Sequence, residues 1–147
     1  MHEDIKKQLE TFNQQVKDLT AIYRCAASQH SVSENEFWVW YTLLVSGEEY
    51  SQQDICEMWS LPKQTINSVI AHLRQKGFLS LEMEPGTRNR KIIRLTESGK
   101  AFGEKIVTPI YEAEQRTLAR LTVQEREQCV ALMEKYVTTF REELDEK

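Results

Sequence analysis

The stretch of sequence that decides the fold is SQQDICEMWSLPKQTINSVIAHLRQKGFLSLEMEPGTRNRKIIRLT, residues 51–96. Its first half predicts two short helices, over about 51–59 and 62–76, with a turn between them. Its second half predicts a hairpin, because 78–84 alternates apolar and polar residues and 91–95 returns after a turn rich in Pro, Gly and Asn. This order is typical of a winged helix-turn-helix, a shape used mainly to place one helix in the DNA major groove.

Local signals mark the ends of both helices. Ser51 and Asp54 stand in the positions of a capping box, in which side chains satisfy the free amides of a helix start. Pro62 suits the first turn of the second helix because its missing amide hydrogen would be unpaired there, and Gly77 is suited to end it. An apolar stripe faces the core, which leaves a polar face made of Lys63, Gln64, Thr65, Asn67, Ser68 and His72.

The charge of the chain is unevenly distributed. Residues 62–94 carry seven Lys or Arg and only two Glu, a net charge of +5 within a chain whose total is -4. Because a local basic surface sets the attraction to phosphates, the acidic total does not exclude nucleic acid. The alternative is that these charges form an ordinary solvated face.

Together, the polar helix face and the basic hairpin predict a DNA-binding surface, since such side chains bond to base edges and phosphates. Arg88 or Arg90 would reach phosphates or an adjacent minor groove, and the sequence leaves open which of the two does so. The expected contact residues are Ser51, Gln52, Lys63, Gln64, Thr65, Asn67, Ser68, His72, Arg74, Arg88, Asn89 and Arg90.

Both ends of the chain predict long amphipathic helices. In each, apolar residues recur at alternating spacings of three and four, which places them on one face. The first stripe is Ile5, Leu9, Phe12, Val16, Leu19 and Tyr23; the last, after a capping box at Thr122 and Glu125, is Val130, Met133, Val137, Phe140 and Leu144. These stripes indicate packing on something beyond the central domain, with intrachain core packing as the alternative.

A second helix is expected from Ser33, which begins another capping box with Glu36, to about Gly47. This helix is rich in aromatic residues, and core packing is the ordinary interpretation of such bulk. A pocket for a small apolar or aromatic molecule is the alternative, because ligand sites are mostly apolar with a few polar groups. The aromatic residues are Phe37, Trp38, Trp40 and Tyr41.

These residues resemble the multiple antibiotic resistance regulator (MarR) family of winged-helix transcription factors over nearly the whole chain. The resemblance rests on the helix order, on the segments 54–61 and 63–79, and on Leu95-Thr96-Glu97-Ser98-Gly99 after the hairpin. The family's wing usually has Asp and Arg where this chain has Thr87 and Asn89.

The resemblance implies a mainly α fold of six helices with a β-hairpin wing. It implies a homodimer formed by the helical regions 1–30 and 104–147, with 33–100 as the winged helix-turn-helix DNA-binding region. Such a dimer places two recognition helices on a pseudo-palindromic operator with half-sites about 34 Å apart. The helix after Thr96 would connect the two regions, with a kink at Pro109.

Proteins of this family usually repress transcription. They release DNA when a small molecule or an oxidant changes the spacing between the two DNA-binding regions of the dimer. The partners implied are therefore double-stranded operator DNA, a second copy of the chain and a small aromatic or lipophilic effector. The effector is expected between the dimer-forming helices and the DNA-binding region. The residues expected near it are Tyr23, Trp38, Trp40, Tyr41 and Phe102.

Two alternatives remain for the function. A redox-sensing repressor would use Cys25, because the neighbouring Arg24 favours a thiolate, although Cys129 is also present. We expect Cys56, at a position where the family usually has a small buried alanine, to be a core filler. A winged helix can also serve protein interaction without touching DNA.

Several classes of function have no support in the sequence. It contains no Gly-rich phosphate loop, nucleophile elbow or paired catalytic carboxylates, so we expect no enzyme activity. His2, His30 and His72 are far apart in the sequence, so neither a metal site nor a cofactor is expected. No apolar run approaches the roughly 20 residues of a membrane span and no signal pattern begins the chain, which predicts a cytoplasmic protein.

Overall fold

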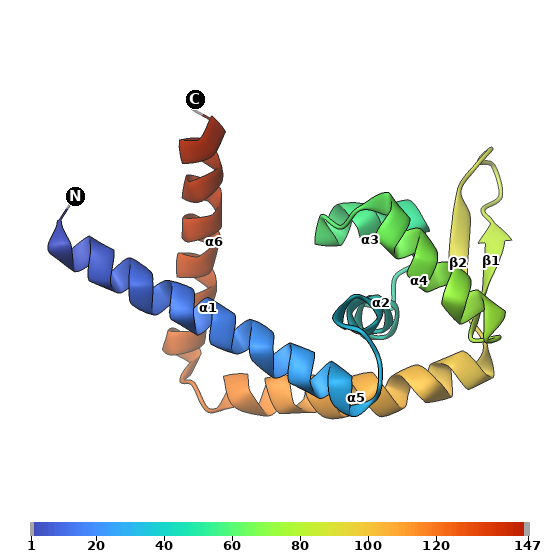
Figure 1. Ribbon diagram of the computed structural model, residues 1–147, viewed down its shortest axis with the longest axis horizontal. Helices are drawn as coiled ribbons and strands as arrows, with labels where there is room; N and C mark the ends of the chain where they lie inside the picture. Colours follow the sequence, from blue (N-terminus) through green and yellow to red (C-terminus); the bar gives the residue numbers. More distant parts are fainter. Residues whose placement is uncertain (1, 146–147) are drawn as a thin grey trace. The chain divides into compact units, whose positions relative to one another are not determined.

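The computed structural model describes residues 2–145 and has six helices and one hairpin within them (Figure 1). The elements are α1 (Glu3–Gln29), α2 (Glu34–Val45), α3 (Gln52–Trp59), α4 (Lys63–Gln75), β1 (Leu79–Met83), β2 (Lys91–Leu95), α5 (Glu97–Ala119) and α6 (Val123–Asp145). The predicted fold class, mainly α with a hairpin wing, is confirmed. The chain divides into two compact units, Met1–Ile110 and Tyr111–Lys147, with the division inside α5.

Two of the predicted capping boxes are present in full. The Oγ of Ser51 accepts from the amide of Asp54 at 3.2 Å, and Asp54 Oδ2 accepts from the amide of Ser51 at 2.8 Å. Thr122 and Glu125 make the same reciprocal pair at the start of α6. Backbone amides that have no partner inside their helix are thereby satisfied, so α3 and α6 begin close to where the sequence predicts.

The third predicted capping box, at the start of α2, is only half formed. Ser33 Oγ accepts from the amide of Glu36 as expected. The Glu36 carboxylate instead accepts from the indole Nε1 of Trp40 at 3.2 Å. A buried indole N–H needs a partner, and this one lies a single turn away on the same helix.

The core of the first unit is built around α2. In Figure 1 this helix is seen end-on, between α3 and the first part of α5. Gly103 of α5 lets the side chains of Trp40 and Leu44 approach its backbone closely, because a Cβ there would overlap both. The largest fully buried side chains are Trp40, Phe37, Ile55, Ile66, Ile70, Leu73, Ile92, Ile106 and Val39.

The wing is an antiparallel hairpin in which Leu79 pairs with Leu95 and Met83 with Lys91. On its outer side, the amide of Ile93 donates to the carbonyl of Tyr50 at 2.9 Å, so the segment just before α3 borders β2. The hairpin is therefore held at two places. It follows α4 along the chain, and β2 bonds to the segment just before α3.

A close approach of two backbones explains the Leu-Thr-Glu-Ser-Gly sequence after the wing. The amide of Thr96 donates to the carbonyl of Phe78, and its hydroxyl donates to the carbonyl of Gly77 at 2.7 Å. The same hydroxyl accepts from the amide of Gly99 at 3.1 Å. A Cβ on Gly99 would overlap the carbonyl oxygen of Phe78, so only glycine fits at this junction.

The two terminal helices keep most of their apolar side chains exposed. In α1 the predicted stripe includes Leu19, which is 55% exposed, and Ala27 is the helix's buried residue. Within its own unit α6 has no buried residue, and Val130 is 66% exposed. Pro109, which we expected to kink the connecting helix, lies inside the continuous helix α5. None of the helices in residues 2–145 is both long and apolar enough to cross a membrane.

Candidate nucleic-acid interface

Helix α4 presents the predicted polar face to solvent. Its apolar residues Ile66, Ile70 and Leu73 are buried, because they recur on one side of the helix. The opposite side carries polar residues that are exposed, apart from the half-buried Thr65: Lys63, Gln64, Asn67, Ser68, His72 and Arg74. The exposed polar side chains of α4 are therefore available to a partner molecule.

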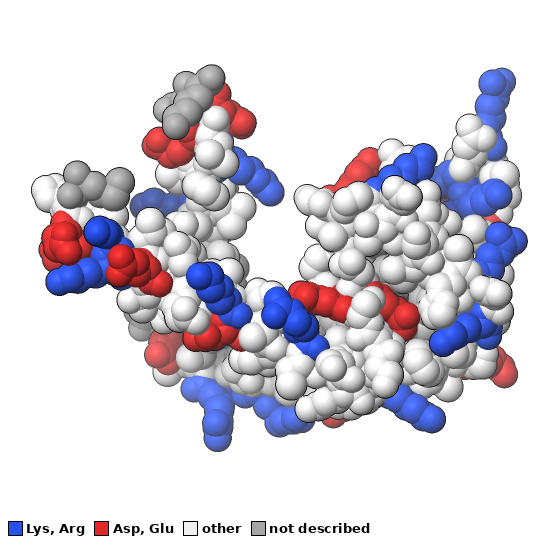
Figure 2. Space-filling model, in the orientation of Figure 1, with Lys and Arg blue, Asp and Glu red and all other residues white. Residues whose placement is uncertain are grey.

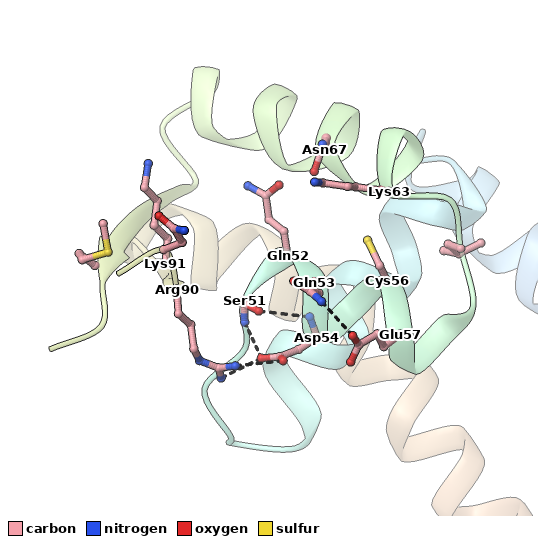
Figure 3. Close-up of a pocket in the computed structure, with 13 residues that line it drawn as sticks. Ser51, Gln52, Gln53, Asp54, Cys56, Glu57, Lys63, Asn67, Arg90 and Lys91 are labelled. Atoms are coloured by element: carbon pink, nitrogen blue, oxygen red, sulfur yellow. Dashed lines mark hydrogen bonds and ion pairs between the residues drawn. The ribbon is translucent and has the colours of Figure 1, made fainter. Parts of the chain in front are cut away.

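A groove of about 1160 Å³ lies between the start of α3, the first turns of α4 and the base of the wing (Figure 3). Gln52 points from α3 toward it, and Lys63 and Asn67 border it on α4. Asn89 and Arg90 line it from the wing. A second hollow, between α4 and β1, shares Gln52 and Asn67 and adds Arg74. Predicted contact residues that are far apart in the sequence are thus brought together on one surface.

Lys91 was missed by the sequence analysis. It is exposed, lines the groove and is the first residue of β2. Figure 2 shows Lys and Arg side chains gathered over the wing and at its tip. The signal for Lys91 was available, since it is one of the seven basic residues of the segment 62–94.

Of the two roles expected for Ser51, the structure shows the one in the capping box. Its side chain is only 8% exposed, and its hydroxyl accepts the amide hydrogen bond of Asp54. The hydroxyl therefore serves the start of α3, which positions Gln52 at the edge of the groove.

Arg90 is held by two carboxylates at the base of the wing. Its Nη1 and Nη2 meet the two oxygens of Asp54 at 3.1 and 2.9 Å, and its Nε meets Glu84 Oε2 at 2.7 Å. Hydrogen bonding to Asp54, together with the charges of both carboxylates, raises the pKa of Arg90. A fork-shaped pair with a carboxylate fixes direction as well as charge.

The carboxyl of Asp54 remains ionised under this arrangement. Burial opposes its ionisation, but the amide of Ser51 and the guanidinium of Arg90 outweigh that effect, and the pKa of Asp54 lies below its ordinary value. Because the pKa of Asp54 is lowered in the folded chain, the ion pair adds stability at pH values above the ordinary pKa of Asp. That contribution is lost as the pH falls through the lowered value.

The remaining wing arginines differ in their surroundings. Arg94 pairs with Glu49 at 2.7 Å and with Glu82 at 3.0 Å. Arg88 is exposed in the middle of the wing turn, and within residues 2–145 no hydrogen bond or ion pair holds its side chain. Arg88 is therefore the wing arginine that is available to an outside anion.

The five aromatic residues expected near an effector fall into two clusters. Tyr23 of α1 meets the ring of Trp38 at 4.8 Å between centroids, and Trp38 meets Tyr41 at 5.4 Å. In the other cluster Trp40 packs at 5.6 Å from Phe102. Trp40 is fully buried, so its ring supports the core, whereas the other four keep part of their surface exposed.

Trp59 is a member of the first cluster that the sequence analysis did not include. Its ring lies 4.6 Å from that of Trp38, and its Nε1 donates to the hydroxyl of Thr42 at 2.7 Å. Trp59 is the last residue of α3, so this cluster joins α1, α2 and α3. Nothing in the sequence near Trp59 indicates the partner of its ring, because that partner lies on another helix.

The comparisons with known proteins agree with this geometry. No family model matches the chain. It is 24% identical over 118 residues to the HTH-type transcriptional repressor NicR of Pseudomonas putida, covering 80% of this chain and 74% of NicR. The structure is similar to NMB1585, a MarR family regulator from Neisseria meningitidis, with a TM-score of 0.81, 24% identity and coverage of 95% and 97% of the two chains. The chain has the fold of the MarR family regulators.

Other solved structures with the MarR fold include Staphylococcus aureus MepR. In its DNA-binding conformation MepR matches with a TM-score of 0.76 at 19% identity, covering 90% of this chain and 98% of MepR. In the MepR–DNA complex the TM-score is 0.68 at 20% identity, with coverage of 89% and 96%. The relatives named here are transcription regulators and not enzymes.

The three cysteines of the chain are all free thiols. Cys25 and Cys129 are exposed, and Arg24 beside Cys25 is paired with Glu34 at 3.6 Å. Cys56 is only partly buried and lines the groove, so its expected role as a core filler is wrong. Its place on α3 faces the groove because the inward position of this helix is taken by Ile55. Within residues 2–145 no cluster of His, Cys, Asp and Glu is suited to a metal ion.

Proposed function

We propose that this chain is a sequence-specific DNA-binding transcriptional regulator of the MarR family, acting as a repressor. The observation that carries the proposal is the groove at which the exposed polar face of α4 meets the basic wing. Short polar side chains at the start of a recognition helix read base edges, and exposed lysine and arginine neutralise phosphates. The fold of the MarR regulators and the similarity to the repressor NicR support this function.

We propose that the functional form is a homodimer. Many large apolar side chains of α1 and α6 are exposed in the single chain. Exposed apolar residues that gather in this way, and are not scattered singly, mark a surface for another protein. A second copy would cover these faces and place two α4 helices on one duplex. The half-sites of a pseudo-palindromic operator would then be about one helical turn, ~34 Å, apart.

Selection from a pool of random duplexes tests this proposal. The purified chain should enrich an inverted repeat whose half-sites are one helical turn apart, and sedimentation should give twice the mass of one chain. Enrichment of a single, unrepeated site would contradict the dimeric arrangement, and recovery of unenriched sequences would contradict sequence-specific binding.

We also propose that a small aromatic or lipophilic effector releases the DNA. The support is the partly exposed cluster of Tyr23, Trp38 and Tyr41, which lies between α1 and α2 and reaches Trp59 at the end of α3. An effector acts only if it binds the DNA-incompetent arrangement more tightly. The effector would therefore shift α3 and α4 away from the spacing that fits the operator.

Titration with simple phenolic and fatty acyl compounds tests the effector. A ligand at this cluster should change tryptophan fluorescence over the same concentration range in which it releases the selected duplex. Release with no change in fluorescence would place the effector elsewhere, and the absence of release by every compound would contradict this class of effector.

A further inference from the structure

We propose that Asp54, Arg90 and Glu84 form a clamp that positions the wing, and that Arg88 makes the wing's contact with DNA. The wing clamp is defined as these three side chains. The part of the inference that concerns DNA rests on the proposed function, whereas the positioning role of the clamp does not.

The clamp joins the start of α3 to the base of the wing. Both oxygens of Asp54 meet the guanidinium of Arg90, and one of them also accepts from the amide of Ser51 (Figure 3). One carboxylate thus closes the capping box of α3 and holds the wing. Any movement of the wing away from α3 has to break this fork-shaped pair or the helix cap.

Arg90 is unsuited to hold a phosphate. Its Nε, Nη1 and Nη2 all face carboxylate oxygens at 2.7 to 3.1 Å. The three side chains carry one positive and two negative charges, so the clamp as a whole is negative. A phosphate would have to displace a carboxylate and then lie beside the displaced negative charge, which costs free energy.

Arg88 has the opposite surroundings. The amide of Glu84 donates to the carbonyl of Arg90 at 2.8 Å and closes the turn, which leaves Arg88 in the middle of it. Its side chain is exposed and, among the described residues, lacks a carboxylate partner. The clamp therefore holds the base of the turn, and Arg88 is carried on the part beyond it.

The variant Asp54→Asn separates positioning from simple electrostatics. Removing this negative charge makes the groove more positive, so long-range attraction alone predicts tighter DNA binding. The clamp predicts weaker binding, because a neutral amide offers one acceptor and cannot form the charged two-bond pair with Arg90, so the wing loses its fixed direction. Long-range attraction and the clamp thus predict opposite changes in the DNA affinity of this variant.

Binding of the selected duplex is measured over a series of salt concentrations. Asp54→Asn and Arg90→Gln should each weaken binding roughly tenfold, and the double variant should be no weaker than the single ones, since all remove one interaction. Arg88→Gln should lower the slope of log K against log salt by about 1.8, for one phosphate in each of two protomers. Arg90→Lys, which keeps the charge but loses the fork, should resemble Arg90→Gln.

The inference is overturned if Asp54→Asn tightens binding, or if Arg90→Gln lowers the salt slope as much as Arg88→Gln does. Hydrogen exchange of the free protein supplies a readout that needs no DNA. Amides of residues 84–90 should exchange faster in Asp54→Asn and Arg90→Gln than in the wild type, and unchanged exchange would remove the clamp. If the wild type binds no duplex while this exchange does rise, the proposed function fails and the clamp stands.

Discussion

Gly99→Ala is expected to lower the free energy of unfolding by about 3 kcal/mol, at the upper end of the cost of overpacking. A Cβ at this position would overlap the carbonyl oxygen of Phe78, which is backbone and has no rotamer to change. That carbonyl accepts from the amide of Thr96, so moving it also weakens the junction between wing and α5. In an unhindered helix the same substitution stabilises by up to about 1 kcal/mol, so even the sign is informative.

Urea unfolding followed by circular dichroism measures this effect. Ala101→Gly, at an exposed position in the same turn of α5, is the matched control and should cost about 1 kcal/mol through helix propensity alone. A Gly99→Ala variant as stable as the wild type would show that the two backbones do not approach as closely as described.

Replacing Lys63 and Arg88 together with glutamine is expected to weaken binding of the selected duplex roughly 1000-fold near 0.15 M salt. Each protomer would lose two phosphate contacts, so the slope of log K against log salt should fall by about 3.6. Lys63 begins α4, whose first turn has no acidic residue. A lysine at a helix N-terminus is unfavourable for the helix, so its loss should not unfold the protein.

The control for this double variant is Lys100→Gln with Lys105→Gln. Both lysines are exposed on α5 and neither lines the groove, while the change in net charge is the same. This control should keep most of the affinity and of the salt slope. Equal losses in the two double variants would mean that total charge, and not the α4 and wing surface, governs binding.

Local features of the fold could be predicted from the sequence. The capping boxes at Ser51 and Thr122 depend on residues three positions apart, and the polar face of α4 depends on helical periodicity. The hairpin turn followed from its Pro, Gly and Asn content. Because each signal lies within a few residues, neighbouring positions were sufficient to predict the element and its orientation.

Features that depend on distant residues could not be predicted in the same way. The partner of Arg90 is Asp54, 36 positions earlier, so the sequence offered Arg88 and Arg90 as equals. Trp59 bonds to Thr42, 17 positions away, and its role in the aromatic cluster was missed for the same reason. The assignment of Cys56 to the core failed because helical periodicity placed Ile55, and not its neighbour, inward.

The proposed function requires that α4 and the wing together bind one DNA sequence specifically. Equilibrium titration of the wild-type chain, at one salt concentration, against the selected inverted repeat and a scrambled duplex of the same composition tests it most directly. We expect at least about 1000-fold tighter binding to the repeat, which is the lower end of the usual range for specific recognition. Equal affinity for the two duplexes would contradict it.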